Sequence, residues 1–521
     1  MKTFASMSTT KTLTTTQKKV VQVKAERNLL GQLLLWSNDH DLNFEKLFTY
    51  PLSPVPWSLA TADGCFVKTN KAQLMHVLEA EAGSDSVQIE EVTDNVVVMD
   101  GNAVIQSLVH LPETFGELAL MIFNCLPKAK SVHFVTDSYH DDSIKNVERS
   151  RRGCSSTLLI GGPSTKMPRD FGAFLRNAEN KRQLVKFILE QWQLPAYAPK
   201  LTDRTVYIVC GEKCYSLMSV GNSVALTEVP EMHSSQEEAD TRVILHCLYE
   251  SHNLSQDDII IVRSPDTDVL VLLLYYCGSF GCTVVFDTGV GIKRRLVPVN
   301  NILEHIGQDV AAALPGFHAF TGSDCTSAFV RKGKKTPYRT MKQNSCFIDT
   351  FCNLGSSASS ISVPVRSELE HFVCTMYGCS KHTRTNEVRS HLFQARYGGN
   401  LRNPLSTTAH IGLDLSLLPP CSDTLTKHCQ RANYQTFIWR NAHVQYPELP
   451  SPVGNGWIAG NSGKLEIHWT DDSILPQSIL DIVGDMSSAS EDDDGEQQCV
   501  EEDDEVDNMI DMIFEDDVEA V

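Results

Sequence analysis

Residues 257–276, DDIIIVRSPDTDVLVLLLYY, place two aspartates between two apolar stretches. The run IIIV is short and β-branched, which predicts a buried strand. Ser264 and Pro265 then give a helix start, with a capping serine before a proline in the first helical position. Asp266 and Asp268 therefore stand at the carboxyl end of a buried strand, where open α/β sheets bind ligands. The alternative is that the two carboxylates only complement the positive end of the helix.

The same pattern recurs along the chain. Two other β-branched runs end in aspartate, NVVVMD at Asp100 and SVHFVTD at Asp137. Further strands are predicted at 205–210, 223–230 and 282–289, and helices at 169–193, 236–252 and 299–314. Strands that alternate with helices predict an α/β fold, a mainly parallel sheet with helices on both faces. After residue 342 the pattern becomes helical.

Acidic residues follow these elements repeatedly, although each one alone also fits a helix cap. The carboxyl ends of parallel strands share one edge of a sheet, so the acids should converge there. Converging carboxylates repel one another unless a cation lies among them. Oxygen ligands without a paired His/Cys set favour Mg²⁺ or Mn²⁺, and two such ions can position the attacking water and the leaving oxygen of a phosphodiester. The expected metal ligands are Asp100, Asp137, Glu238, Asp240, Asp266, Asp268 and Asp324.

The order of these motifs resembles the flap endonuclease family, the structure-specific 5′ nucleases of the PIN-like fold. The similar segments are VVVMDGNAVIQSL, FVTD, EEADTR, SPDTDVL and FTGSD, which fill all seven acidic positions of that family. The resemblance implies a flap-endonuclease-like domain over residues 95–342 that hydrolyses phosphodiester bonds. EEADTR, SPDTDVLVLL and LPGFHAFTGSD are also similar to segments of multi-copy animal proteins associated with mobile elements. The chain departs from the family in the residues that precede Asp100 and in the glycine-rich clamp, of which only Gly333 is kept.

Two basic stretches complete the expected site. The resemblance implies that Lys145 and Arg149, on a predicted helix after Asp137, steady the scissile phosphate, and Arg151 and Arg152 extend this stretch toward nucleic acid. A second stretch is expected to contact the phosphate backbone. For both stretches a solvated surface is the alternative. The second stretch consists of Arg331, Lys332, Lys334 and Lys335.

The acidic residues are unevenly distributed along the chain. Residues 484–521 hold 17 of the 65 Asp and Glu residues and no Lys or Arg, so the rest of the chain carries a formal charge of −3 rather than −20. This segment is predicted to be a disordered acidic tail, which either binds a basic protein partner or keeps the protein soluble. The other predicted regions are a partly disordered N-terminal extension (1–94), the nuclease-like domain (95–342) and a helical region packed on it (343–483).

Composition limits the cellular compartment and the kinds of partner that are expected. No apolar run approaches the roughly 18 residues of a membrane span, so no membrane partner is expected. The 16 cysteines form no regular framework, which favours a reducing compartment, the nucleus before the cytoplasm. The leading hypothesis is a Mg²⁺-dependent nuclease acting on DNA, or less favourably on RNA. The alternatives are a catalytically inactive nuclease-like module that binds nucleic acid or protein, derived from a mobile element, and a phosphatase, which leaves the basic stretches unused.

Overall fold

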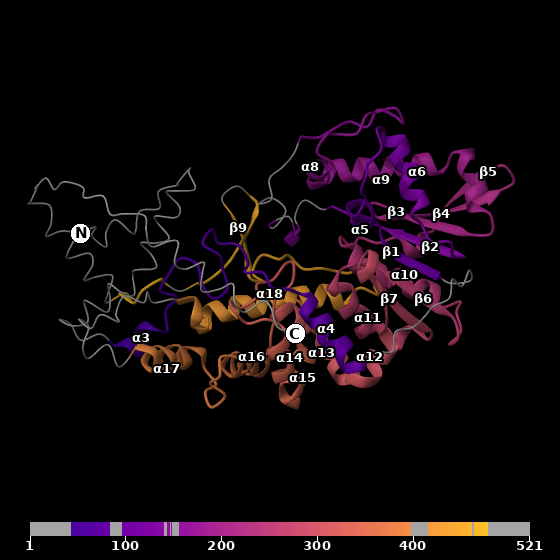
Figure 1. Ribbon diagram of the computed structural model, residues 1–521. Helices are drawn as coiled ribbons and strands as arrows, with labels where there is room; N and C mark the ends of the chain where they lie inside the picture. The colour runs from indigo at the N-terminus through magenta and orange to yellow at the C-terminus, as the bar shows by residue number, and fades with distance from the viewer. Residues whose placement is uncertain are drawn as a thin grey trace, which may run out of the picture. The chain divides into compact units, whose positions relative to one another are not determined.

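The larger of the two sheets that the computed structural model describes is a mixed sheet of eight strands (Figure 1). The structure describes residues 43–83, 96–139, 143–145, 147, 156–397, 415–460, 463–471 and 473–477. The strand order is β5-β4-β3-β2-β1-β6-β7-β8, and the five strands from β3 to β7 in this order run parallel. The predicted α/β class with a mainly parallel sheet is confirmed. The strands are β1 (Val96–Asp100), β2 (Ser131–Val135), β3 (Thr205–Cys210), β4 (Lys213–Val220), β5 (Ser223–Glu228), β6 (Ile259–Arg263), β7 (Thr283–Thr288) and β8 (Arg295–Pro298).

The outer strands of the sheet are antiparallel. β4 and β5 follow β3 as two hairpins, and β8 pairs with β7 at the other edge. The sequence analysis did not predict β4, because KCYSLMSV shows neither the regular alternation of a half-buried strand nor a continuous apolar run.

Both faces of the central strands are covered by helices, as Figure 1 shows. On one face Val97 and Met99 of β1 pack in a core with α6 (Phe115–Asn124), α8 (Phe171–Arg176) and α9 (Ala178–Trp192). On the other face Val96 and Val98 belong to a larger core with α10 (Ala239–Ser251), α11 (Thr267–Phe280) and α12 (Val299–Ile306). Burial on both faces explains why β1 is apolar throughout rather than alternating.

Helix α11 begins two residues later than the sequence predicted. Asp266, and not Ser264, is its N-cap, because the Asp266 carboxylate accepts a hydrogen bond from the Asp268 amide at 3.0 Å. The Ser264 hydroxyl accepts from the Asp266 amide at 3.1 Å and so holds the turn before the helix. α11 is apolar and buried on nearly all sides, which is typical of a central core helix.

Two stretches predicted as single helices are each broken in two. α12 and α13 (Gln308–Phe320) meet at Gly307, whose φ of 83° is a left-handed conformation that favours glycine. α8 and α9 meet at Asn177, whose side chain caps α9 by accepting from the amides of Glu179 and Asn180. In both places a residue suited to a helix end overrides the helical periodicity.

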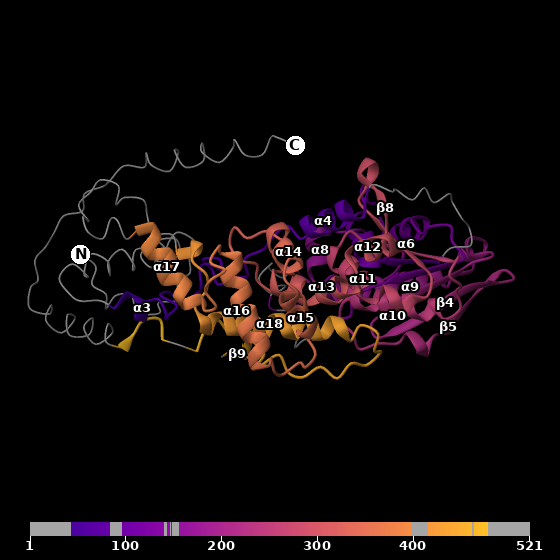
Figure 2. The ribbon, with the colours of Figure 1, turned by 90° about the horizontal axis from the view of Figure 1, so that it is seen from below.

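The described part of the N-terminal extension is built into the fold. It contains α3 (Phe44–Leu47) and α4 (Ala72–Ala82), and Leu74, Met75 and Leu78 of α4 lie in the larger core. α4 packs against α12 and α14 (Lys335–Lys342), as Figure 2 shows. The boundary at residue 95 thus does not separate the described extension from the core.

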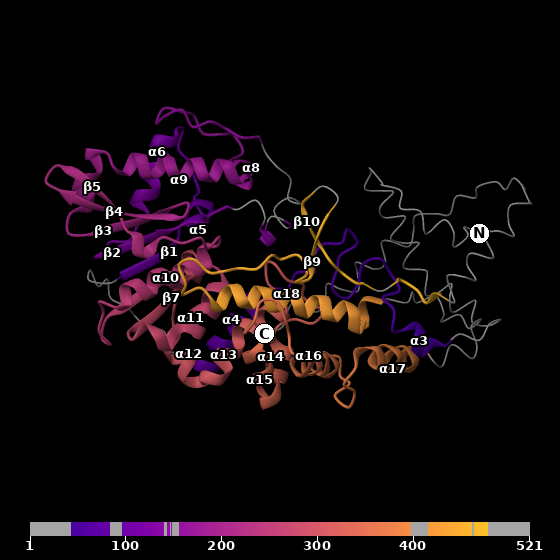
Figure 3. The ribbon, with the colours of Figure 1, turned by 180° about the vertical axis from the view of Figure 1, so that it is seen from behind.

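The described C-terminal helices belong to the same compact unit as the sheet. α18 (Ser422–Arg440) packs against α13 (Figure 3), and residues of α16 (Val363–Met376) and α18 lie in the larger core. Among the described helices none is long and apolar enough to cross a membrane. The predicted acidic tail, 484–521, lies outside the described residues. The remaining elements are α5 (Gly101–Gln106), α15 (Ser345–Asn353), α17 (Thr385–Tyr397), β9 (Trp457–Ala459) and β10 (Leu465–Ile467).

Candidate metal centre

The predicted acidic residues lie at the sheet edge where the strand order reverses. The chain runs outward from β1 through β2 and β3, and later returns to β6 on the other side of β1. Asp100 is in register with Val135, two residues before Asp137, and Met99 is in register with Arg263, just before the SPDTD motif. Such a switch point at the carboxyl ends of the strands is where open α/β sheets bind ligands.

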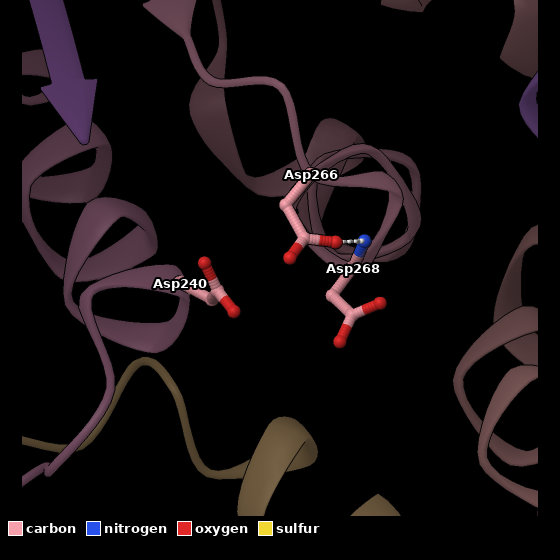
Figure 4. A group of neighbouring side chains, drawn as sticks. All are labelled: Asp240, Asp266 and Asp268. Atoms are coloured by element: carbon pink, nitrogen blue, oxygen red, sulfur yellow. Dashed lines mark hydrogen bonds between the residues drawn. The ribbon is translucent and has the colours of Figure 1, made fainter. Parts of the chain in front are cut away.

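Three carboxylates form the centre of the cluster, as Figure 4 shows. Asp240 lies in the first turn of α10, Asp266 caps α11 and Asp268 lies in its first turn. Each offers a carboxylate oxygen, and these oxygens all lie within 4.8 Å of one another. Asp240 and Asp268 are buried, with exposures of 6% and 2%. The positive ends of the two helices favour negative charge here but do not remove the repulsion among the carboxylates.

The outer acidic residues surround this centre. Asp100 ends β1 and accepts a hydrogen bond from the Ala103 amide at 3.0 Å. Asp137 accepts from the Ala239 amide at 2.9 Å, which joins the end of β2 to the start of α10. Asp324 follows the turn at Gly322, where a φ of 112° and the atoms of Ala328 leave no room for a side chain. A cleft of about 800 Å³ is lined in part by Asp100, Asp137, Asp240, Asp266 and Asp324.

Two lysines contact different carboxylates of the cluster. The Lys145 ammonium lies 3.0 Å from the Glu238 carboxylate, which brings the seventh predicted acid to the site. The Lys71 ammonium lies 2.9, 3.0 and 2.8 Å from carboxylate oxygens of Asp266, Asp268 and Asp324. The sequence analysis missed Lys71, since KTNKAQ has the composition of an ordinary surface turn and lies outside the α/β pattern.

Four carboxylates of the cluster have raised pKa values, and two of them, Glu238 and Asp266, keep a raised pKa beside a lysine. Burial raises the pKa of both Asp100 and Glu238 to about 7, and the pKa of Asp266 to about 6. Burial and the nearby Asp266 raise the pKa of Asp240 well above its usual range. Burial would also raise the pKa of Asp324, but the Lys71 ammonium outweighs it and holds that pKa below its usual range. For these four carboxylates, the cost of burying the charged form exceeds the stabilisation that neighbouring groups give it. This arrangement favours binding of a cation.

His318 fixes the central carboxylate Asp268. Its Nε2 lies 2.8 Å from the Asp268 carboxylate, and its ring stacks on Trp439 with centroids 5.7 Å apart. Burial and the nearby Lys334 hold the pKa of His318 well below its usual range, so the ring is neutral and donates its Nε2 proton to Asp268. His318 therefore acts as a positioning residue for a candidate metal ligand.

The second basic stretch needs a correction. Lys334 is fully buried, and its ammonium donates to the His318 carbonyl at 3.0 Å and to the Thr321 hydroxyl at 2.9 Å. It supports the turn below the site and cannot contact nucleic acid. The Lys332 ammonium lies over the Tyr377 ring, 4.4 Å from its centroid, whereas Arg331 and Lys335 are exposed. The predicted residues Arg149, Arg151 and Arg152 lie outside the described residues.

A different set of basic residues lines the cleft itself. Arg169 precedes α8, Arg176 ends it, and Lys181 lies in the first turn of α9, where its ammonium is 4.5 Å from the centroid of the Tyr139 ring. The sequence analysis treated this region only as a helix. Its signal was a set of basic residues in a stretch with helical periodicity, which is common on solvated helix faces. We refer to Arg169, Arg176 and Lys181 as the basic wall of the cleft.

No family model matches the chain, and no curated protein is significantly similar to it in sequence. The fold and the site define a class in structural terms: an α/β protein with a carboxylate cluster at the switch point of its sheet. The functional conclusion for this particular chain rests on that geometry and its charges.

Proposed function

We propose that the protein is a metal-dependent nuclease that hydrolyses phosphodiester bonds of DNA or RNA, with a PIN-like, flap-endonuclease-like domain. The observation that carries the proposal is the convergence of seven acidic residues, from five segments of the chain, on one cleft edge. A group of this size is costly to hold together, and its order along the chain is that of the resembled nucleases.

The residues present fit a hard divalent cation. All candidate ligand atoms are carboxylate oxygens, the donors that Mg²⁺ and Mn²⁺ prefer. Within the described part of the chain, Asp100 and Asp240 make no direct ion pair, so they are the carboxylates best placed to hold the ion. When bound, such an ion activates water and neutralises charge on a phosphate.

The cations of the protein have separate roles in this proposal. Lys145 lines the cleft beside Glu238 and offsets the charge that develops on the phosphate during hydrolysis. The basic wall holds phosphates of the strand away from the reacting one, through contacts that do not depend on base sequence. A substrate with several phosphates contacts both Lys145 and the basic wall, whereas a small phosphorylated molecule does not reach the basic wall.

The proposal is tested with purified full-length protein and labelled 5′-flap, single-stranded and duplex substrates, in Mg²⁺ and in EDTA. We expect Mg²⁺-dependent cleavage by the wild type and a loss of orders of magnitude in Asp268→Asn. Asp287→Asn is the matched control, because Asp287 is equally buried at the end of β7 but pairs with Arg263 and Arg294 outside the cleft. Equal cleavage by wild type and Asp268→Asn would assign the activity elsewhere. Binding without cleavage on every substrate would favour the inactive binding module instead.

A further inference from the structure

The Lys71 ammonium occupies a cation position within the carboxylate cluster. Three carboxylates from two segments surround it at 2.8 to 3.0 Å. The side chain is only 21% exposed, and three carboxylates at hydrogen-bond distance are the partners of a charged ammonium. Lys71 is thus a full positive charge at the edge of the candidate metal centre.

The position of Lys71 is set by packed structure. Lys71 is the N-cap residue of α4, and the next turn of this helix carries Leu74 and Met75 into the core. α4 also packs against α11, the helix that carries Asp268. Lys71 and Asp268 are therefore held by two helices in direct contact, which fixes the ammonium among the carboxylates.

We propose that the Lys71 ammonium takes the place of a second divalent cation, so that the centre binds one metal ion per chain. The inference rests on the proposed function and makes it more specific. The sequence analysis expected two ions on the seven carboxylates. A resident ammonium bound to Asp266, Asp268 and Asp324 repels a divalent ion from the same oxygens.

The lysine at Glu238 supports the same count. Lys145 pairs with Glu238 at 3.0 Å, so a second carboxylate position of the cluster also holds an ammonium. Asp100 and Asp240 line the cleft, and neither makes a direct ion pair with another residue that the structure describes. One position for a metal ion remains, at the cleft edge beside Asp100 and Asp240. Lys71 is a positioning residue in this arrangement, since it sets where the ion and hence the phosphate lie.

The number of bound ions tests the inference directly. Mn²⁺ binding to the full chain is measured by electron paramagnetic resonance, and Asp240→Asn reports the ions bound elsewhere, such as on the acidic residues 484–521. We expect one site-specific ion in the wild type and two in Lys71→Met, which keeps the length of the side chain and removes its charge. If Lys71→Met does not fold, Lys71→Gln replaces it in the test, because its amide still donates to a carboxylate. Lys71→Gln should also bind two site-specific ions. Lys342→Met is the matched control, because it breaks a lysine–carboxylate pair with Glu81 on the same helix α4.

A purely structural lysine would change stability but not the count of ions. Two site-specific ions in the wild type, or the same count in wild type and both Lys71 variants, would overturn the inference. A cleavage assay distinguishes failure of this inference from failure of the proposed function. If the wild type cleaves nucleic acid but the ion count does not change in the Lys71 variants, only the role of Lys71 is refuted. If the ion counts are as expected but no cleavage occurs, the nuclease is refuted and the cation position of Lys71 stands. In an active enzyme, Lys71→Met should need at least about tenfold more Mg²⁺ for half-maximal rate, since a weakly held second ion must replace the ammonium.

Discussion

Replacing Asp100 by asparagine removes one negative charge from the cleft and keeps the shape of the side chain. The Asp100 carboxylate accepts from the Ala103 amide at 3.0 Å, and an asparagine oxygen accepts the same bond, so the cap of α5 is retained. Burial raises the pKa of Asp100 from 3.8 to about 7, and nearby Asp137 and Asp266 add repulsion. Each tenfold change in an acid constant is worth about 1.4 kcal/mol, so ionising Asp100 costs at most about 4 kcal/mol. Because water in the cleft reduces the cost of ionising Asp100, we expect about half of this value, about 2 kcal/mol.

The difference in stability between Asp100→Asn and the wild type depends on pH. The folded wild type keeps the Asp100 proton up to about pH 7, whereas the unfolded chain loses it near pH 4. The folded state therefore holds more protons in this window, and its free energy of unfolding falls as pH rises. Asparagine does not titrate. Metal-free Asp100→Asn should match the wild type near pH 4, gain stability up to pH 7 and stay about 2 kcal/mol more stable at pH 8. Urea unfolding followed by circular dichroism in EDTA measures the difference.

Asp287→Asn is the control for this measurement, because its effect on stability should have the opposite sign. Burial would raise the pKa of Asp287, but Arg294 and Arg263 outweigh it and hold that pKa below its usual range. Asp287→Asn should therefore destabilise the protein at pH 8, by an amount that shrinks as pH falls through the carboxylate range. An Asp100→Asn protein that is no more stable than wild type at pH 8 would refute the reasoning that these carboxylates are held together at a cost. In Mg²⁺, the same variant should lose most cleavage activity, because it lacks a metal ligand.

Other parts of the site give three further predictions. Lys145→Ala should lower turnover more than substrate binding, because its contact strengthens as charge develops; single-turnover kinetics and fluorescence anisotropy measure the two. Arg169→Ala with Arg176→Ala should weaken binding and reduce the slope of log K against log salt by about 1 per lost contact, whereas Lys334→Met should leave this slope unchanged. A chain that begins at residue 95 should fail to fold by circular dichroism, since each buried leucine lost with α4 is worth about 1.5–3 kcal/mol.

The central strands and their acidic ends were predictable because one rule governs both. A strand buried on two faces is mainly apolar, so VVVM, VHFV and IIIV stand out, and the first acidic residues after them lie at or just beyond the strand ends. Asp100, Asp137 and Asp266 are these residues. The boundaries inside helical stretches were less predictable, because Gly307 and Asn177 act through single backbone conformations that periodicity does not detect.

The cationic half of the site was not predictable in this way. Lys71 reaches the carboxylates only because α4 packs beside α11, a contact between segments almost two hundred residues apart that no local pattern encodes. Lys334 was misassigned for the related reason that a run of basic residues looks solvated. One of its members turns inward in the structure and satisfies the His318 carbonyl.

The two lysines also bear on how an anionic strand enters an acidic cleft. Seven carboxylates repel both one another and a phosphate, so under the proposed function the cleft must gain positive charge before the strand binds. Lys71 and Lys145 supply part of it from within the fold, and they leave Asp100 and Asp240 as the uncompensated pair. A divalent ion at that pair reverses the local charge at the point where the reacting phosphate must lie. The basic wall of the cleft is already positive without the ion. Binding of the strand should therefore depend only moderately on Mg²⁺, whereas cleavage should depend on it entirely.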